Sequence, residues 1–451
     1  MEYVDLSYSS DGVYEDDQPV ILANPYPPIT FPPGDSSLVT NSLRYGANTY
    51  TFIAEQQNAT ASVGVSQQIV QALQLRCQTE QQLTKRNFVL PTQSASEQAN
   101  IKLPLGVKLS DYVTTPTPDL TAAENNNNNN RNRRPAIVID CEMVGVRIQN
   151  SESQPPSRRR PPHVRGVPST TTTTTTTKTN TNPRPRQTPP APWERSELVQ
   201  LCAIDGVTGE ILIDRPVQPA GRVCNWRTKY SGMTLAKLKA AQQTAGAVLP
   251  HWRDARALLL GYMDSETVLV GHSVENDLQM LRLAHPRVVD TSMQTAAAVF
   301  GQHGLDAFPR IWGLRKLVGR LTGKNIQAHG GKSAAAAAVR SGTRAAATTG
   351  HDCVEDTLAA RELTLWCILH PAGLAAWGWE MRKEIAEKEA AEREKRREEE
   401  ERKRIRAEKK ERAAAAAAKA REEEEARAVR ELQEKFDEMW PSLEPRRPLG
   451  F

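Results

Sequence analysis

The chain has 451 residues, of which 39 % are hydrophobic, and its formal net charge is +5 at pH 7. No run of 18 apolar residues occurs, so we expect neither a membrane span nor a membrane partner. The mean hydropathy of −0.55 excludes a packed core over the whole length, and one globular domain with long polar extensions is the simplest interpretation.

The N-terminal region, residues 1–132, is acidic and rich in Pro, Ser, Thr, Gln and Asn, and we expect it to be disordered apart from a short helix. That helix is predicted at 66–75, where SQQIVQALQL has helical spacing. The first residues lack the apolar stretch of a secretory signal. A run of asparagines at 125–130 is typical of a linker.

The predicted globular domain covers residues 133–375 and is interrupted by two low-complexity segments, at about 148–195 and 325–350. The first segment contains eight consecutive threonines at 170–177 and several arginines. These arginines could hold RNA by charge. A tolerated, disordered loop is the alternative.

Apolar segments in the domain alternate between strand and helix patterns. Strands are predicted from Arg134 through RPAIVIDCEMVGV and at 197–204, 210–213, 267–270 and 288–290, and helices at 234–242, 251–263, 275–284, 291–299, 311–317 and 351–369. Because later strands are followed by helices, the order predicts an α/β domain with a mixed central sheet flanked by helices.

The C-terminal region, residues 376–440, consists mostly of Glu, Lys, Arg and Ala and is followed by a short tail at 441–451. Its composition predicts one long charged helix with many i,i+4 ion pairs. A coiled coil is the alternative, although apolar residues are sparse for a continuous seam. Either form could bind protein partners.

Six cysteines occur, and none forms a Cys-x-x-Cys pair or a His–Cys cluster with zinc spacing. We therefore expect a reducing, intracellular compartment.

The first candidate for a catalytic or metal-binding segment is Asp140-Cys141-Glu142, at the end of an apolar strand. Residues i and i+2 of a strand point to the same face, so the two carboxylates project together. Like charges raise one another's pKa, and a divalent cation would remove the conflict. The alternative is that the strand ends here and both carboxylates are exposed to water.

Two further segments carry acids at the ends of predicted elements. In LVGHSVENDLQML, a buried strand turns into a helix that bears Asp277. In HDCVED, Asp356 lies in the first turns of a helix and His351 just before it. Taken singly, a solvated acid or a helix cap explains each of them. Glu275 and Glu355, nearby, are expected to face solvent.

Together, DCEMVGV, LVGHSVENDL and HDCVEDT resemble the three motifs of the DEDD exonuclease superfamily, in its His-containing (DEDDh, DnaQ-like) branch. DCEMVG, VVDTSMQ and IWGLRKLVGRLTGKNIQ are similar to the eukaryotic RNA exonuclease (Rex-type) group. The tyrosine branch would need Tyr at position 352, where this chain has Asp. The resemblance covers about residues 135–370 and implies an RNase H-like exonuclease fold.

The resemblance also implies a mechanism. Asp140, Glu142, Asp277 and Asp356 would hold two Mg²⁺ or Mn²⁺ ions, with Asp277 acting directly or through water. His351 would be the general base that activates the attacking water. The product would be a nucleoside 5′-monophosphate.

Substrate contacts are implied for Met143, Val144 and His272, with core packing or a structural role as the alternatives. Arg315 and Lys316 could meet phosphates or simply lie on a solvated helix face.

The expected function is a 3′→5′ exoribonuclease that binds single-stranded RNA 3′ ends, acts in RNA processing, including that of ribosomal RNA, and is located in the nucleus or nucleolus. The cytoplasm is the alternative location. A DNA 3′→5′ exonuclease is the alternative function, because the metal site cannot distinguish DNA from RNA. A non-catalytic nucleic-acid-binding scaffold on the same fold is the third candidate.

Overall fold

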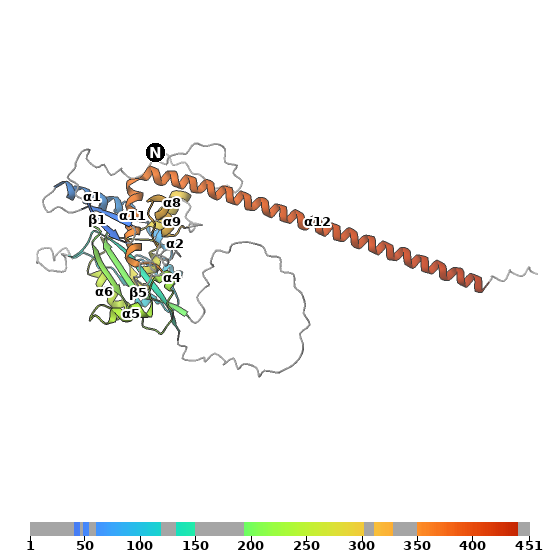
Figure 1. Cartoon of the computed structure of the whole chain (residues 1–451), viewed down its shortest axis with the longest axis horizontal. Helices are drawn as coiled ribbons and strands as arrows, with labels where there is room; N and C mark the ends of the chain where they lie inside the picture. Colours follow the sequence, from blue (N-terminus) through green and yellow to red (C-terminus); the bar gives the residue numbers. More distant parts are fainter. Residues whose placement is uncertain are drawn as a thin grey trace, which may run out of the picture. The chain divides into compact units, whose positions relative to one another are not determined.

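The computed structural model describes residues 40–45, 48–53, 60–118, 132–148, 194–301, 311–327 and 350–440. The chain divides into two compact units, Met1–Trp379 and Glu380–Phe451 (Figure 1). Most of the predicted low-complexity insertions, including the threonine run, lies outside the described residues. Among the helices of the described part, none is both long and apolar enough to cross a membrane.

A mixed sheet forms the centre of the first unit, with the strand order β10-β8-β4-β5-β6. The long strands β4 and β5 are antiparallel, as are β5 and β6, whereas β8 and β10 run parallel to β4. The bounds are β4 Ala136–Arg147, β5 Glu194–Asp205, β6 Ile211–Pro216, β8 Val268–Gly271 and β10 Val288–Asp290, and β7 Val223–Asn225 pairs with the end of β4. The predicted α/β architecture, a mixed central sheet flanked by helices, is confirmed.

Helices cover both faces of this sheet, and β4 shows which residues face which layer. Ile137, Ile139 and Cys141 belong to the large hydrophobic core, together with residues of α6 (Trp252–Leu260) and α7 (Glu275–Leu281). On the opposite face, α11 (Cys353–Leu369) packs against β4, β5 and β8. Because side chains alternate along a strand, Asp140 and Glu142 lie on the α11 side.

The remaining helices of this layer are α8 (Thr291–Phe300) and α9 (Leu314–Leu321), and both pack against α11. The short α4 (Thr228–Ser231) and α5 (Leu235–Gln242) follow β7. Neither β7 nor α4 was predicted, because three- and four-residue elements carry too little periodicity to be recognised.

The prediction of a disordered N-terminal region is wrong for residues 60–118. They form α1 (Thr60–Gln74), α2 (Glu80–Lys85), α3 (Ala95–Ala99), the 3₁₀ turn Leu109–Asp111 and β3 (Val113–Thr114). Leu83, Phe88, Leu90 and Val107 are buried in the same core as the sheet. Widely spaced apolar residues of this kind produce no periodic pattern, which is why composition was misleading. The predicted helix at 66–75 overlaps α1, which begins six residues earlier and ends at Gln74.

Earlier still, β1 (Thr40–Tyr45) and β2 (Asn48–Ile53) form an antiparallel hairpin. Asn48 exchanges hydrogen bonds with the backbone of Asn325, and Tyr45 donates to Asp352 at 3.0 Å. The hairpin therefore contacts the segment that leads into α11.

The predicted helix 275–284 ends early, at Leu281. Arg282 has φ 50°, the left-handed conformation that ends a helix, and β9 (Leu283–Ala284) then pairs in parallel with β3. Tertiary pairing with the N-terminal segment thus overrides the helical pattern of the sequence.

The C-terminal helix α12 (Pro371–Met439) is continuous, as Figure 1 shows. In the second unit, residues from Glu384 on carry i,i+3 and i,i+4 ion pairs such as Lys388–Glu384 and Lys403–Glu399. Nearly all of its described residues are exposed, as expected for a solvated charged helix. The coiled-coil alternative stays a prediction.

Candidate active site

Asp140 and Glu142 lie in the middle of β4, not at its end as the apolar run suggested. The parallel neighbour β8 pairs only with Ala136–Val138, so the acids lie just beyond that pairing, where β4 is open on one side. On its other side β4 continues to pair with β5, with a β-bulge directly after Glu142. Asp140 is partly exposed, and Glu142 is buried.

The N-terminus of α11 brings His351 and Asp356 to the same place. Asp352 begins the helix by accepting hydrogen bonds from the backbone N–H groups of Val354 and Glu355, each at 3.1 Å. Ligand atoms of Glu142, His351 and Asp356 lie within 4.8 Å of one another, as do those of Asp140, Glu142 and Cys353. Segments more than 200 residues apart in sequence therefore meet in one cluster.

His351 is held from two sides. Nδ1 lies 3.1 Å from Asp356 Oδ2, and the ring packs edge-on against Tyr230. Gly232, with φ 57°, lies so close that a Cβ atom would overlap the carbonyl oxygen of His351. The imidazole is 34 % exposed, so water can reach it.

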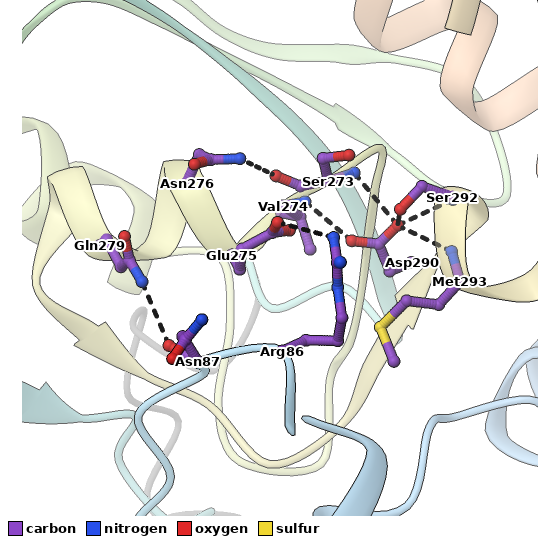
Figure 2. Close-up of polar contacts among 10 residues, drawn as sticks. All are labelled: Arg86, Asn87, Ser273, Val274, Glu275, Asn276, Gln279, Asp290, Ser292 and Met293. Atoms are coloured by element: carbon purple, nitrogen blue, oxygen red, sulfur yellow. Dashed lines mark hydrogen bonds and ion pairs between the residues drawn. The ribbon is translucent and has the colours of Figure 1, made fainter. Parts of the chain in front are cut away.

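Asp277 is placed by a strand-to-helix turn that Asp290 holds together (Figure 2). Ser273 adopts φ 57°, and the N–H groups of Ser273 and Val274 donate to the Asp290 carboxylate at 3.1 and 2.9 Å. The same carboxylate caps α8 through Ser292 and Met293. Asp290 thus fixes the beginnings of α7 and α8 together.

Burial and mutual repulsion dominate the electrostatics of the cluster. Burial, and then the charges of neighbouring acids, raise the pKa of Glu142 to about 10. The pKa of Asp140 is raised by burial and by Asp356, and that of Asp277 by burial and by Asp140. A hydrogen bond from the backbone of Cys141 partly offsets the shift at Asp277.

This donor set fits a hard divalent cation. The carboxylates of Asp140, Glu142 and Asp356 supply ligand atoms to the two overlapping groups, which Asp277 does not join. Within the described ranges no Lys or Arg side chain forms an ion pair with Asp140, Glu142 or Asp277. Oxygen donors without a counter-charge suit Mg²⁺ or Mn²⁺, whereas the buried Cys353 thiol is not needed for such an ion.

A cleft of about 760 Å³ opens over the cluster. Its lining combines the acidic side with the first turn of α9, and comprises Asp140, His272, Ser273, Gly313, Leu314, Arg315, Lys316, Gly319, Gln327, His351 and Asp356. Arg315 and Lys316 therefore lie on the wall of the cleft and not on a remote helix face.

The three proposed substrate residues differ in their surroundings. His272 lines the cleft, with Nδ1 2.7 Å from Thr291 Oγ1. Met143 is partly buried against the large core. Val144 is fully buried with Val146 and Val199, so core packing, the alternative for this residue, describes its side chain.

The expectation that Glu275 and Glu355 face solvent is wrong. Glu355 is 1 % exposed and accepts the N–H of Gln327 at 2.8 Å. Glu275 is partly buried and pairs with Arg86 at 3.1 Å, as Figure 2 shows. Both partners lie in segments whose packing the sequence did not reveal, and burial raises the pKa of Glu275 to about 7.

Gln327 is a site residue that sequence reasoning missed. Its Nε2 lies 2.9 and 3.1 Å from the two oxygens of Asp356 and 3.3 Å from His351 Nδ1. The only signal was its place at the end of IWGLRKLVGRLTGKNIQ, a stretch already noted for its resemblance.

Sequence comparison finds relatives that are named exonucleases. The chain is 27 % identical over 172 residues to "RNA exonuclease 3" of Candida albicans, a match covering 38 % of this chain and 34 % of that protein. It is 29 % identical over 170 residues to "Exonuclease GOR" of Pan troglodytes, covering 38 % and 20 %. The matched region is thus about a third or less of each of these two relatives. No protein-family model matches the chain.

Among solved structures, the pseudoubiquitin hydrolase–RNA exonuclease module of Saccharomyces cerevisiae Pan2, in complex with AAGGA RNA, is 18 % identical. The match covers 58 % of this chain and 33 % of that chain, with a TM-score of 0.33.

Proposed function

We propose that this chain, a relative of the RNA exonucleases and similar to the DEDDh superfamily, is a metal-dependent 3′→5′ exoribonuclease. The observation that carries the proposal is the cluster that Asp140 and Glu142 of β4 form with His351 and Asp356 at the start of α11, because Asp140, His351 and Asp356 also line the cleft. Asp277 is buried and does not line the cleft, but its charge acts on Asp140. The direction of digestion rests on the resemblance of these motifs.

In the proposed reaction the chain's own groups have distinct tasks. Asp140, Glu142 and Asp356 would hold the divalent ions, and Asp277 would complete the acidic set. When bound, two such ions stabilise the charge that develops on the attacking and leaving oxygens. His351, whose imidazole is partly exposed, would accept the proton of the attacking water. The product is a nucleoside 5′-monophosphate.

The substrate of this proposal is a single-stranded RNA 3′ end in the 760 Å³ cleft. Arg315 and Lys316 on the cleft wall would attract its phosphates. Processing of RNA, including ribosomal RNA, and a location in the nucleus are the pathway and compartment we propose for it.

The test uses the full-length chain with Mg²⁺ or Mn²⁺ and RNA labelled at its 5′ end. We expect stepwise shortening from the 3′ end, abolished by EDTA, and reduced by a factor of about 10³ or more in Asp140→Asn. The matched control is Asp254→Asn, which changes an exposed acid in the first turn of α6.

A DNA strand of equal sequence separates the two nuclease candidates, because faster digestion of DNA would replace RNA as the proposed substrate. RNA binding without any metal-dependent shortening would overturn the enzyme proposal in favour of a scaffold.

A further inference from the structure

Residues 324–327, which precede α11 in the chain, are anchored at each of their four positions. The anchors are an ion pair of Lys324 with Glu362, reciprocal hydrogen bonds of Asn325 with Asn48, the full burial of Ile326, and the bond from the Gln327 N–H to Glu355. Gln327 itself has φ 56°, a conformation that costs free energy in a residue with a side chain. The backbone is therefore held in place by groups that do not belong to the acidic cluster.

The anchored backbone places the side-chain amide of Gln327 in the site. Gln327 Nε2 lies 2.9 Å from Oδ1 and 3.1 Å from Oδ2 of Asp356, so it faces both oxygens of one carboxylate. It also lies 3.3 Å from His351 Nδ1. An amide NH₂ has two donor hydrogens and no charge, so it can satisfy a carboxylate without forming an ion pair.

We propose that Gln327 is a positioning residue whose amide donates to the carboxylate of Asp356 and competes with a cation for its two oxygens. This inference rests on the proposed function, since it concerns the same metal site. The partial positive charge of the amide hydrogens and the charge of a cation would act on the same two oxygens. The amide and the ion therefore compete for the same oxygens.

Competition has a measurable consequence. A hydrogen bond to a charged group contributes about 1.5–3 kcal/mol, and each 1.4 kcal/mol corresponds to about a tenfold change in an equilibrium constant. Removing the amide donor therefore makes ion binding tighter by about tenfold. A residue with a purely structural role would change affinity in the opposite sense, because a loosened Asp356 holds the ion less well.

The experiment measures Mn²⁺ binding to the full-length chain by calorimetry, without RNA. Gln327→Met keeps the length of the side chain and removes the donor, and we expect its dissociation constant to fall about tenfold. The matched control is Gln93→Met, which removes an amide that bonds Thr84 and Phe88 away from the cluster, and we expect no change. Asp356→Asn must weaken binding, which shows that the heat comes from this site.

A second variant keeps the inference testable if Gln327→Met does not fold. Gln327→Leu removes the donor without adding a charge, and tighter Mn²⁺ binding is again expected. Unchanged or weaker binding in the folded variants overturns the role of Gln327 and leaves the nuclease proposal intact. If the wild-type chain neither binds Mn²⁺ nor shortens RNA, the nuclease proposal fails first.

Discussion

The charged forms of single acids in the cluster lower the free energy of unfolding of the protein. Asp140, Glu142 and Asp277 have raised pKa values because burial and neighbouring acids disfavour their charged forms. An ordinary domain would replace such acids by neutral residues. These acids are explained if their charges bind a cation. Replacing one of them should then change the free energy of unfolding as well as the activity.

Asp140→Asn is therefore expected to stabilise the protein in the absence of metal while slowing RNA shortening by the factor given above. An acid with a raised folded-state pKa binds more protons when folded than when unfolded, so its stability contribution is lost as pH rises above the unfolded value of about 4. The variant should gain about 1 kcal/mol over the wild type at pH 8 and nothing at pH 4. Urea unfolding at both values measures this, with Asp254→Asn as the control. An equal gain at both pH values would contradict it.

At the scale of elements, the turn between β8 and α7 and the start of α8 depend on one side chain. Asp290 is fully buried, and its carboxylate accepts the N–H groups of Ser273, Val274, Ser292 and Met293. The beginnings of two helices are thus joined at a single acceptor, close to the acid Asp277.

Asp290→Ala is expected to lower the free energy of unfolding by about 3 kcal/mol or more, since buried donors lose their acceptor. Thr234→Ala, which removes the N-cap of α5, provides the comparison, with an expected loss of about 1 kcal/mol. Urea denaturation of both variants measures the difference. Equal losses would mean that Asp290 acts only as a helix cap.

Much of this arrangement is predictable from sequence. The mixed sheet follows from periodicity, and the i,i+2 spacing places Asp140 and Glu142 on one face of β4. The contacts of Arg86, Tyr45 and Gln327 could not be predicted, because each joins segments that are distant in sequence and carry no repeating pattern. The solvent exposure expected of Glu275 and Glu355 fails for that reason.

At the scale of the whole molecule, the first unit extends well beyond the stretch that resembles exonucleases. Residues 60–118 add side chains to the central core, and Gln78 bonds the backbone of β10 at Val288 and Asp290. Arg86 pairs with Glu275, two residues before Asp277. A fragment that begins at residue 132 would lose all of these contacts.

Deletion of residues 1–131 is expected to abolish cooperative folding of the first unit. The burial of Leu83, Phe88 and Leu90 is worth about 1.5–3 kcal/mol each, and together this approaches the 5–15 kcal/mol that a whole domain commonly has. Deletion of residues 386–451, which are exposed where the structure describes them, should leave thermal unfolding and RNA shortening unchanged. Circular dichroism melting of the two truncated chains measures this. Cooperative melting of the N-terminal deletion near the wild-type temperature would contradict it.

The position of α11 near the end of the first unit also orders events during synthesis on the ribosome. β4 is made early, but His351 and Asp356 are added more than 200 residues later. Contacts of such long range form slowly, and domains fold as units once their chain is available. A nascent chain therefore carries Asp140 and Glu142 without their partners, and the complete acidic cluster first exists when nearly all of the unit has been translated.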